Sequence, residues 1–498
     1  MSDDSEELDS KAGEPKPPKI KAETNRWYLL STLYGEPKFG DDEPREKNRV
    51  AWNRYFAANL RSETRTRLIS EKRYSEEELT PLSSGELVGI ARAFGVRSEA
   101  SKGFALPSTA SVIDFSNVEF DQDADFGGYV LVDCTFSEAT FAGVAGFENA
   151  IFSGRIDFKR TTFADDAGFD GALFAGAAYF NGVTFLHVVE FENATFLGLA
   201  SFDNATFPEY DDANFRSATF FFATFKHATF FGGAIFAGAT FLNYAKFRSA
   251  TFSDYANFCG ATFSQGVNFT DATFLDFADF ARATFSAKAD FAGVTFSAAS
   301  DFVNAEMKSE TSFESAIFKT SPPKFFGAKL HQGTVWRDVT WPTPKDVHVA
   351  GAFIDAYACL KLEMDRLKKH EDELDFFAVE LQSRSVLLGT WTGLPIAIYG
   401  VVSDYGRSYL RPLVALFYLA LIGTLAHLSA DSLSPWQSLG LSAANTLNVF
   451  GFRKDFFEPT VIAHLPAWLD VVSALQTILG TILLFLCGLG IRNKFRMK

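Results

Sequence analysis

The chain has 498 residues, enough for two to four structural units, and 56 of them are Phe. Its net charge is −15, and the stretch from 112 to 342 alone carries 28 acidic and 14 basic residues, which argues against nucleic-acid binding there. The four cysteines are far apart and form no CxxC pair, which excludes a disulfide frame and a thiolate metal site and is typical of a reducing compartment.

Residues 1–24 mix acidic, basic and proline residues and have almost nothing to bury, so we expect a disordered tail and no signal peptide. Residues 25–100 carry apolar side chains at helical spacing, such as Trp52 and Phe56, and Ser83-x-x-Glu86 has the pattern of a capping box. This helical module is interpreted either as a partner-binding domain or as a cap over the open end of the repeat that follows. The cap is favoured because strand edges need cover.

From Phe141 to Phe207 a Phe returns after alternately five and six residues, and the series resumes at Phe230 and runs to Phe302. A small residue, usually Ala, stands two positions before nearly every Phe, so both face the same side of a short strand. Two sides of five and two of six make one turn, with the extra residue of each longer unit at a corner. The pattern predicts a β-coil over 112–342 with stacked Phe inside, roughly ten turns and on the order of 50 Å long.

Ala213-Asn214-Phe215, Ala256-Asn257-Phe258 and Ala278-Asp279-Phe280 fit the motif A-[DN]-[LF]-x-x. This stretch resembles the pentapeptide-repeat proteins, and the resemblance implies a right-handed quadrilateral β-helix. The expected fold class is therefore mainly β, with an α-helical N-terminal cap and a C-terminal α-helical region that contains two transmembrane helices.

The alternation breaks between Phe207 and Phe215. The intervening residues form a candidate partner loop: Pro208, Glu209, Tyr210, Asp211 and Asp212. One interpretation is an acidic loop that recognises a partner. The favoured one is an insertion at a corner, because loops accept changes of length at little cost in free energy.

Residues 351–388 carry apolar side chains at steps of three and four, among them Tyr357 and Leu360. Two interpretations stay open here. One is an oligomerising coiled coil, and the other is a hairpin of helices 352–370 and 373–388 with Asp372 as a cap. Residues 389–406 are apolar but too short to cross a bilayer, so we expect them at the membrane interface.

Two transmembrane helices are predicted at 409–430 and 469–491, joined by an extracytoplasmic loop at 431–467. Arg407 and Arg411 precede the first span, and residues 492–498 form a basic tail, so both termini and the repeat are expected in the cytoplasm. Asp404-Tyr-Gly-Arg-Ser and the stretch starting at Arg26-Trp-Tyr-Leu-Leu resemble bacterial membrane-anchored pentapeptide-repeat proteins. That resemblance implies a multi-pass protein of the bacterial inner membrane, without a settled biochemical activity.

The sequence contains no GxxxxGK[ST], HExxH or GxSxG motif, so we expect no enzyme, no cofactor and no metal site. Polar residues do occur in the predicted spans, and they are candidates for either a pore lining or a packing face. Packing is favoured because small polar residues commonly hold membrane helices together. These residues are His427, Ser473, Gln476, Thr477 and Thr481.

The leading functional hypothesis is a non-enzymatic, membrane-anchored scaffold that presents an acidic rod to a cytoplasmic protein partner. A first alternative is an oligomeric two-transmembrane channel-like protein. In that case 436–445 would be a pore helix, although the filter position from Thr446 to Phe452 has few glycines. A second alternative is a DNA-mimic regulator of a topoisomerase, which the resemblance and the charge of the repeat permit.

Overall fold

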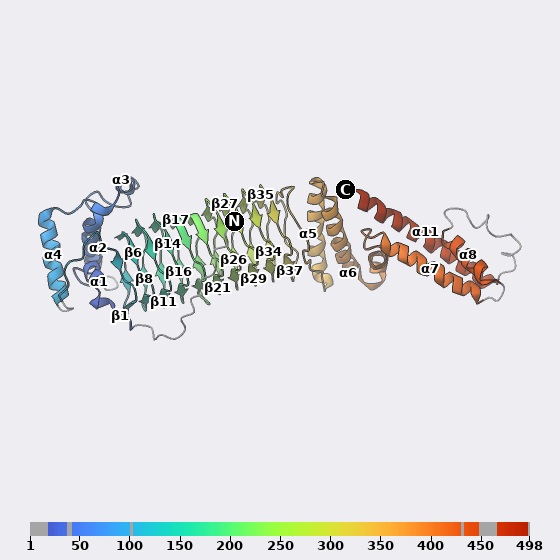
Figure 1. Ribbon diagram of the computed structural model, residues 1–498, viewed down its shortest axis with the longest axis horizontal. Coiled ribbons are helices and arrows are strands. Elements are labelled where there is room, and N and C mark those ends of the chain that lie inside the picture. Colours follow the sequence, from blue (N-terminus) through green and yellow to red (C-terminus); the bar gives the residue numbers. More distant parts are fainter. Residues whose placement is uncertain (1–17, 37–41, 100–102, 430–432, 448–465, 497–498) are drawn as a thin grey trace. The chain divides into compact units, whose positions relative to one another are not determined.

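The computed structural model describes residues 18–36, 42–99, 103–429, 433–447 and 466–496. The chain divides into two compact units, one reaching to Ile317 and including Gly333–Arg337, the other formed by Phe318–Gln332 and the chain from Asp338 onward. The first unit holds N-terminal helices and a long β-solenoid, and the second holds the C-terminal helices (Figure 1).

Short elements precede the solenoid: β1 (Ile20–Lys21), η1 (Ala22–Thr24), α1 (Arg26–Ser31), α2 (Asp42–Phe56), η2 (Ala57–Asn59), α3 (Ser62–Ser70) and α4 (Ser84–Ser98). Residues 1–17 of the expected disordered tail lie outside the described residues. The expectation is wrong for residues 20–24, because β1 pairs in parallel with the first strand of one solenoid sheet. An open strand edge offers unpaired N–H and C=O groups, which β1 satisfies.

The solenoid strands form three parallel sheets of 11, 9 and 17 strands. Sheet A contains β1, β3 (Val118–Phe120), β7 (Thr140–Phe141), β11 (Thr162–Phe163), β15 (Thr184–Phe185), β18 (Thr206–Phe207), β21 (Thr229–Phe230), β25 (Thr251–Phe252), β29 (Thr273–Phe274), β33 (Thr295–Phe296) and β37 (Ile317–Phe318). Sheet C contains β4 (Ala124–Asp125), β8 (Ala145–Gly146), β12 (Ala167–Gly168), β16 (Val189–Glu190), β19 (Ala213–Asn214), β22 (Ala234–Ile235), β26 (Ala256–Asn257), β30 (Ala278–Asp279) and β34 (Ser300–Asp301).

Sheet B covers the two remaining faces. Its strands are β2 (Ile113–Asp114), β5 (Val130–Leu131), β6 (Cys134–Thr135), β9 (Ile151–Phe152), β10 (Ile156–Asp157), β13 (Leu173–Phe174), β14 (Ala178–Tyr179), β17 (Thr195–Ser201), β20 (Thr219–Thr224), β23 (Thr240–Phe241), β24 (Ala245–Lys246), β27 (Thr262–Phe263), β28 (Val267–Asn268), β31 (Thr284–Phe285), β32 (Ala289–Asp290), β35 (Glu306–Met307) and β36 (Thr311–Ser312). The two faces count as one sheet because β17 and β20 run round the corner between them, and β17 pairs with both β13 and β14.

The register of the strands confirms the predicted turn. Thr162 pairs with Thr184, which is four alternating units further along the chain. Across the insertion, Val189 pairs with Ala213, two positions beyond the regular register, and Ala213 then pairs with Ala234, one position short of it. The nine strands of sheet C give about nine turns, one fewer than expected, because regular pairing stops after β37. Pro322 and Pro323 follow there and have no N–H to donate to a ladder.

The interior of the solenoid consists of four columns of Phe rings, one column behind each face. Phe258, for example, is fully buried and stacks on Phe236 at 4.9 Å and on Phe280 at 5.0 Å. Along the columns, successive ring centroids lie between 4.2 and 5.6 Å apart. The small residue of each unit is buried between columns, so the predicted inward assignment of Ala and Phe is correct.

Each A-[DN]-F side ends in a tight corner, and the sequence motif follows from its geometry. The Asx side chain accepts a backbone N–H two residues on, as Asp279 Oδ1 does from Ala281 N at 2.8 Å. Two residues after the Phe the backbone is left-handed, as at Gly260 with φ 68°. Ala261 N then donates to Phe258 O at 3.0 Å and closes the turn.

The N-terminal helices cover the first turns of the solenoid. Trp52 Nε1 donates to Val130 O at 2.9 Å. Asn53 Oδ1 accepts from Val130 N at 2.7 Å, and its Nδ2 donates to Gly128 O at 2.9 Å. These contacts pair backbone groups that the solenoid cannot pair itself, as the cap interpretation requires.

The C-terminal helices are α5 (Val347–Arg366), α6 (His370–Ser403), α7 (Leu410–Leu428), α8 (Pro435–Thr446) and α11 (Ala467–Arg496). The first part of α6 packs against α5 as a hairpin, and Lys361 on α5 forms an ion pair with Glu380 on α6. Asp372 does not cap the second helix as expected. It lies in the first turn of α6 and pairs with Lys369 at 2.6 Å.

Three of these helices are long and apolar enough to cross a membrane, namely α6, α7 and α11, whereas the sequence predicted two spans. The sequence pattern did not predict α6 as a span, because its apolar part begins only near residue 389. At Gly389 the helix is broken, with φ 74° and ψ −175°. The part beyond this break, Thr390–Ser403, is roughly 21 Å long as a helix and so shorter than a bilayer core. Its predicted place at the membrane interface stays a prediction.

Candidate functional sites

The corner loop, Pro208 to Asp212, lies between β18 of sheet A and β19 of sheet C. Pro208 is buried and its carbonyl accepts from Gly232 N at 2.6 Å, while Tyr210 is 89% exposed. Asp211 Oδ2 lies 3.4 Å from His187 Nδ1 on the preceding turn. The loop is therefore an insertion at a corner, and it carries one large side chain fully outward.

Two glycines of the next turn make room for the corner loop. A Cβ at Gly232 would collide with the carbonyl oxygen of Asp211, and one at Gly233 would collide with the carboxylate of Asp212. The loop thus rests on the turn beneath it, so its backbone is supported on the solenoid side.

The diagonally opposite corner of the same turns carries an exposed apolar cluster. We call it the apolar corner patch and define it by Leu197, Phe221, Leu242 and Tyr244, which are 41 to 53% exposed. Leu197 and Phe221 stand on β17 and β20, where Leu199 pairs with Phe222 as the strands pass round the corner, and Leu242 and Tyr244 lie between β23 and β24. The ring of Phe222 lies 6.3 Å from that of Tyr244.

Sequence reasoning missed this patch. The signal was the residue directly after an inward Phe, which is Ser or Ala in many units but Leu or Phe at 197, 221 and 242. Gly266 of the next turn marks the same place, because a Cβ there would lie 2.5 Å from the Tyr244 ring.

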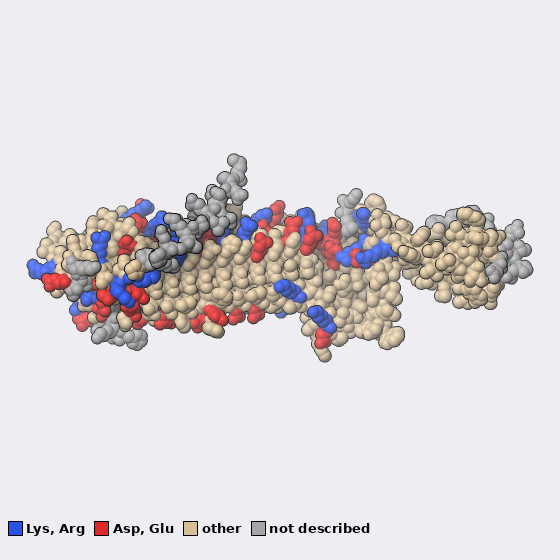
Figure 2. Space-filling view, turned by 60° about the horizontal axis from the view of Figure 1, so that its bottom comes forward, with Lys and Arg blue, Asp and Glu red and all other residues tan. Residues whose placement is uncertain are grey.

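The charge of the solenoid is not spread evenly. Figure 2 shows one face on which Asp and Glu side chains follow one long edge, Lys and Arg mix with Asp and Glu along the other, and a broad strip with few charges lies between them. Sheet A has such an uncharged face, because the outward residue is Thr in eight successive strands, from Thr140 to Thr295. Sheets B and C, in contrast, carry acidic residues at outward strand positions, such as Asp290 and Asp279, so the sheet A face differs from the others.

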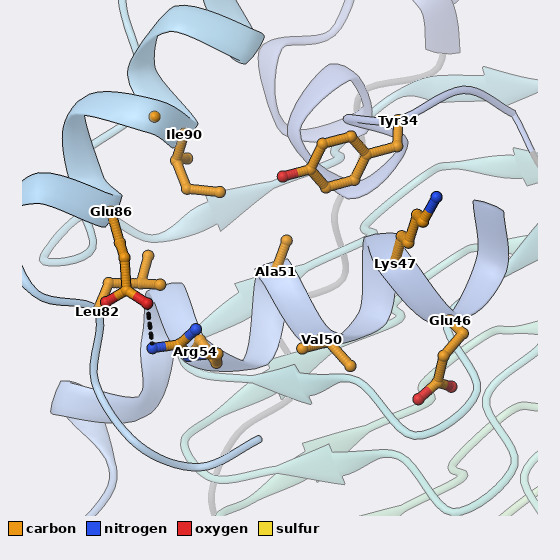
Figure 3. A pocket seen from close by; sticks show the side chains of 10 residues that line it. Tyr34, Glu46, Lys47, Val50, Ala51, Arg54, Leu82, Glu86 and Ile90 are labelled. Carbon is orange, nitrogen blue, oxygen red and sulfur yellow. Dashed lines mark hydrogen bonds and ion pairs between the residues drawn. The ribbon is translucent and has the colours of Figure 1, made fainter. Parts of the chain in front are cut away.

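A groove of about 600 Å³ lies between α2 and α4 in the N-terminal module (Figure 3). Its floor is apolar and includes Val50, Ala51 and Ile90. At its rim Arg54 and Glu86 form an ion pair at 2.8 Å. The rim charges are therefore satisfied by each other, and the groove offers mainly apolar contact.

A second concavity, of about 510 Å³, lies where these helices meet the first turns of the solenoid. Two of its three arginines are paired with carboxylates, Arg45 with Asp125 and Arg49 with Glu78 at 2.7 Å. Burial raises the pKa of Glu78 and of Glu148, although Arg49 opposes the shift at Glu78. The site joins the helices to the solenoid, because Arg45 pairs with Asp125 and Arg73 donates to Gly171 O, both on the solenoid.

Among the described residues, one group of three could hold a metal ion: Asp365, His370 and Glu373, at the turn between α5 and α6. Their ligand atoms lie within 4.8 Å of one another, and His370 Nδ1 is 3.1 Å from Glu373 Oε2. The sequence signal, a His and a Glu three residues apart at the start of a helix, was overlooked. The hydrogen bond between His370 and Glu373 is a sufficient reason for the arrangement.

The predicted polar residues of the spans do not share one face. Ser473 and Gln476 are buried between α7, α8 and α11, and His427 is buried in the last turn of α7. Thr477 is half-buried and Thr481 is exposed, and each hydroxyl donates to a carbonyl of its own helix, at 2.9 and 2.8 Å. A helix that places residues 473 and 476 inward turns 481 away, because it has 3.6 residues per turn.

Gln476 connects all three helices. Its Nε2 lies 3.2 Å from Leu419 O on α7, and 2.8 and 3.3 Å from the hydroxyls of Ser442 and Thr446 on α8. Gly423 leaves the space for this side chain, since a Cβ there would collide with Nε2. The geometry at Gln476 is that of a packing contact between helices, and the choice between packing face and pore lining for the five residues stays a prediction.

The solenoid agrees with a known repeat family. The family model for Pentapeptide repeats (9 copies) matches residues 133–173, 169–209 and 247–295. Over these residues the solenoid is built of pentapeptide repeats. The matches leave out the turns around the insertion, where the spacing departs from the regular alternation. No curated protein and no solved structure matches the chain.

Proposed function

We propose that the chain is a non-enzymatic, membrane-anchored scaffold whose pentapeptide-repeat solenoid binds a cytoplasmic protein partner. The observation that carries the proposal is the apolar corner patch. Clustered, exposed Leu, Phe and Tyr side chains on a soluble surface are typical of protein–protein contact. Here they stand on a solenoid whose remaining outward positions are rich in Thr and acidic residues.

The corner patch suits a binding role because its backbone is fixed. Parallel pairing to the turns above and below holds β17 and β20, so the patch side chains need little ordering when a partner binds. Tyr210 of the corner loop offers a second contact surface on the opposite side of the same turns.

The proposed location is a bacterial inner membrane, with both termini and the solenoid in the cytoplasm. Asn493 Nδ2 donates to Gly406 O at 3.1 Å, so the start of α7 and the end of α11 lie side by side. These ends carry the basic residues, including Arg411 and Lys494, and basic flanks favour the cytoplasmic side. Reporter fusions after residue 498 and within 448–465 test this orientation, and an external C-terminus would contradict it.

Site-specific photocrosslinking in membranes tests the scaffold proposal. A photoreactive residue at Phe221 should form a defined adduct with another protein, and the adduct should weaken when Leu242→Ser and Tyr244→Ser are added. The matched control is position Leu275, which is 47% exposed and also follows an inward Phe, but lies on sheet A. Self-adducts alone at 221, or equal adducts at both positions, would contradict the proposal.

A further inference from the structure

The short helix α8 lies alongside the middle of two longer helices. Ser442 Oγ donates to Ala420 O at 2.6 Å, and Thr446, the last residue of α8, meets Gln476 on α11. Gln476 also donates to the carbonyl of Leu419, which is the central residue of α7 (Leu410–Leu428). The end of α8 is therefore level with the midpoint of α7.

The direction of α8 follows from the same contacts. Residue 442 lies beside 420, while α8 begins only a few residues after α7 ends. So α8 runs antiparallel to α7, from the end of α7 back to its centre. With 12 residues it is roughly 18 Å long, about half of a bilayer core.

The burial pattern of α8 is in part the reverse of that of a helix in water. Its buried side is mixed, with Ser438, Ser442 and Asn445 beside Leu441 and Ala444, whereas Leu439 is 44% exposed and Leu447, just past its end, is 37% exposed. A helix at an aqueous surface hides its apolar side and shows its polar side. A helix against lipid can expose Leu, because hydrocarbon solvates it, and its polar groups then lie between helices, where Ser442 hydrogen-bonds to Ala420 O and to Gln476.

The start of α8 also fits a membrane boundary. Ser434 and Gln437 form a capping box, in which Ser434 Oγ accepts from Gln437 N at 3.3 Å and Gln437 Oε1 accepts from Ser434 N at 3.0 Å. Trp436 in this first turn is 81% exposed. Trp is enriched at the level of the lipid headgroups, where its ring is apolar and its N–H reaches water.

We propose that α8 is a re-entrant membrane helix, whose outer side contacts lipid chains through Leu439 and Leu447 and whose polar side packs on α7 and α11. This rests on the proposed membrane anchoring and revises the expectation that 431–467 is an extracytoplasmic loop. The lipid-facing side continues that of α7, where Phe417 is 66% exposed. Most of 448–465, including the expected filter segment, lies outside the described residues.

Spin labels on the full chain in proteoliposomes test the proposal. The background replaces the four cysteines by Cys134→Ala, Cys259→Ser, Cys359→Ser and Cys487→Ala, and labels are attached at Leu439→Cys or Leu447→Cys. Phe417→Cys on α7 is the lipid reference, and the exposed Ser84→Cys on α4 is the water reference. We expect oxygen, which is enriched in lipid, to relax the spin labels at 439 and 447 several-fold more than an aqueous nickel chelate does. The ratio of the two effects should be larger at 447, which lies deeper in the bilayer.

The two reference labels separate the membrane anchor from the re-entrant position of α8. If 417 behaves as lipid-exposed while 439 and 447 resemble 84, the re-entrant helix is refuted and the membrane anchor stands. If 417 also resembles 84, the anchor itself fails. Protection of 439 from both relaxing agents, with spin–spin broadening, would mean that a second copy covers this side and would overturn the lipid contact.

A measurement with the native cysteines covers the case in which the background does not fold. Trp emission of the wild type and of Trp436→Phe is compared in vesicles of phosphatidylcholine brominated on its acyl chains. The difference in Trp emission between wild type and variant is the emission of Trp436. We expect the brominated lipids to quench this emission. If this emission is instead quenched by aqueous acrylamide and not by brominated lipid, the proposal is wrong.

Discussion

At the scale of single residues, the solenoid depends on the difference between inward and outward Phe. Inward Phe rings stack in columns and are fully buried, whereas Phe221 and Phe231 point outward and are 47 and 45% exposed. The same residue type thus contributes to stability in one place and to the surface in the other. The distinction lies only in position within the unit, because successive strand residues face opposite sides.

The inward column makes a quantitative prediction. Phe258→Ala should lower the free energy of unfolding by about 3–5 kcal/mol, because it removes a buried ring and leaves a cavity between Phe236 and Phe280. Urea unfolding followed by far-ultraviolet circular dichroism measures the change. Phe231→Ala is the control and should shift the midpoint little. A midpoint for Phe258→Ala equal to that of the control would contradict the inward assignment.

Which residues are buried in the solenoid could largely be predicted from the sequence. The five–six spacing identified the inward Phe and Ala correctly, because burial in a repeat is decided by period alone. The apolar corner patch was not predicted. Phe196 pairs with Phe220 and Phe220 with Phe241, so the residues that follow them, Leu197, Phe221 and Leu242, lie on neighbouring turns and form one cluster. A single exposed Leu or Phe in the sequence carries no such information.

At the scale of elements, caps and breaks decide where helices begin and end. The capping box of α4 was predicted from Ser83 and Glu86 and is present. The expected boundary in α6 between residues 388 and 389 coincides with the break at Gly389, where φ is 74° and the helix resumes beyond it. The polarity of α8 could not be predicted either, because it depends on which helices it packs against.

The α4 cap predicts a pH dependence. Hydrogen bonds from the Ser83 side chain and backbone, and then from Arg54, lower the pKa of Glu86 from 4.5 to about 2. A carboxyl whose pKa is lower in the folded state stabilises it above the unfolded pKa and loses this effect as pH falls. The melting temperature should therefore be higher in wild type than in Glu86→Gln at neutral pH.

The difference between these two proteins should shrink as pH falls below about 4.5 and vanish near pH 2. Circular dichroism melting over this range checks the prediction. Glu99→Gln, at the other end of α4, serves as the control for the removal of a carboxylate from this helix. A difference that is constant with pH would show that the effect of Glu86 does not come from its charge.

At the scale of the whole molecule, the solenoid and the C-terminal helices follow different rules. The solenoid repeats one unit and is stabilised turn by turn, so its length can change by insertion or loss of turns. The helices depend on specific contacts between unlike partners. One of these is Arg407, which lies 2.8 Å from Asp375 and 3.0 Å from Asp404.

The repeat rule can be tested by deletion. Thr251 pairs with Thr273, so removing Thr251–Ala272 takes out one complete turn and brings Thr273 into the place of Thr251. We expect a folded solenoid with a slightly lower melting temperature. Removing Thr251–Phe274 is the matched control, because it also takes away β29 and leaves one face of that turn without a strand. Equal melting of both deletions would argue against turn-by-turn pairing.

The alternation of faces links the length of the solenoid to the direction in which its surfaces point. Thr251 on sheet A and Thr262 on sheet B begin equivalent strands half a turn apart, on opposite faces. Loss of Thr251–Ala261 would therefore preserve the Phe columns but rotate everything beyond it by half a revolution about the solenoid axis. Loss of a whole turn would shorten the solenoid and leave its later faces pointing in the same directions. The number of whole turns thus sets the length of the solenoid, and an added or lost half turn reverses the direction in which the later faces point.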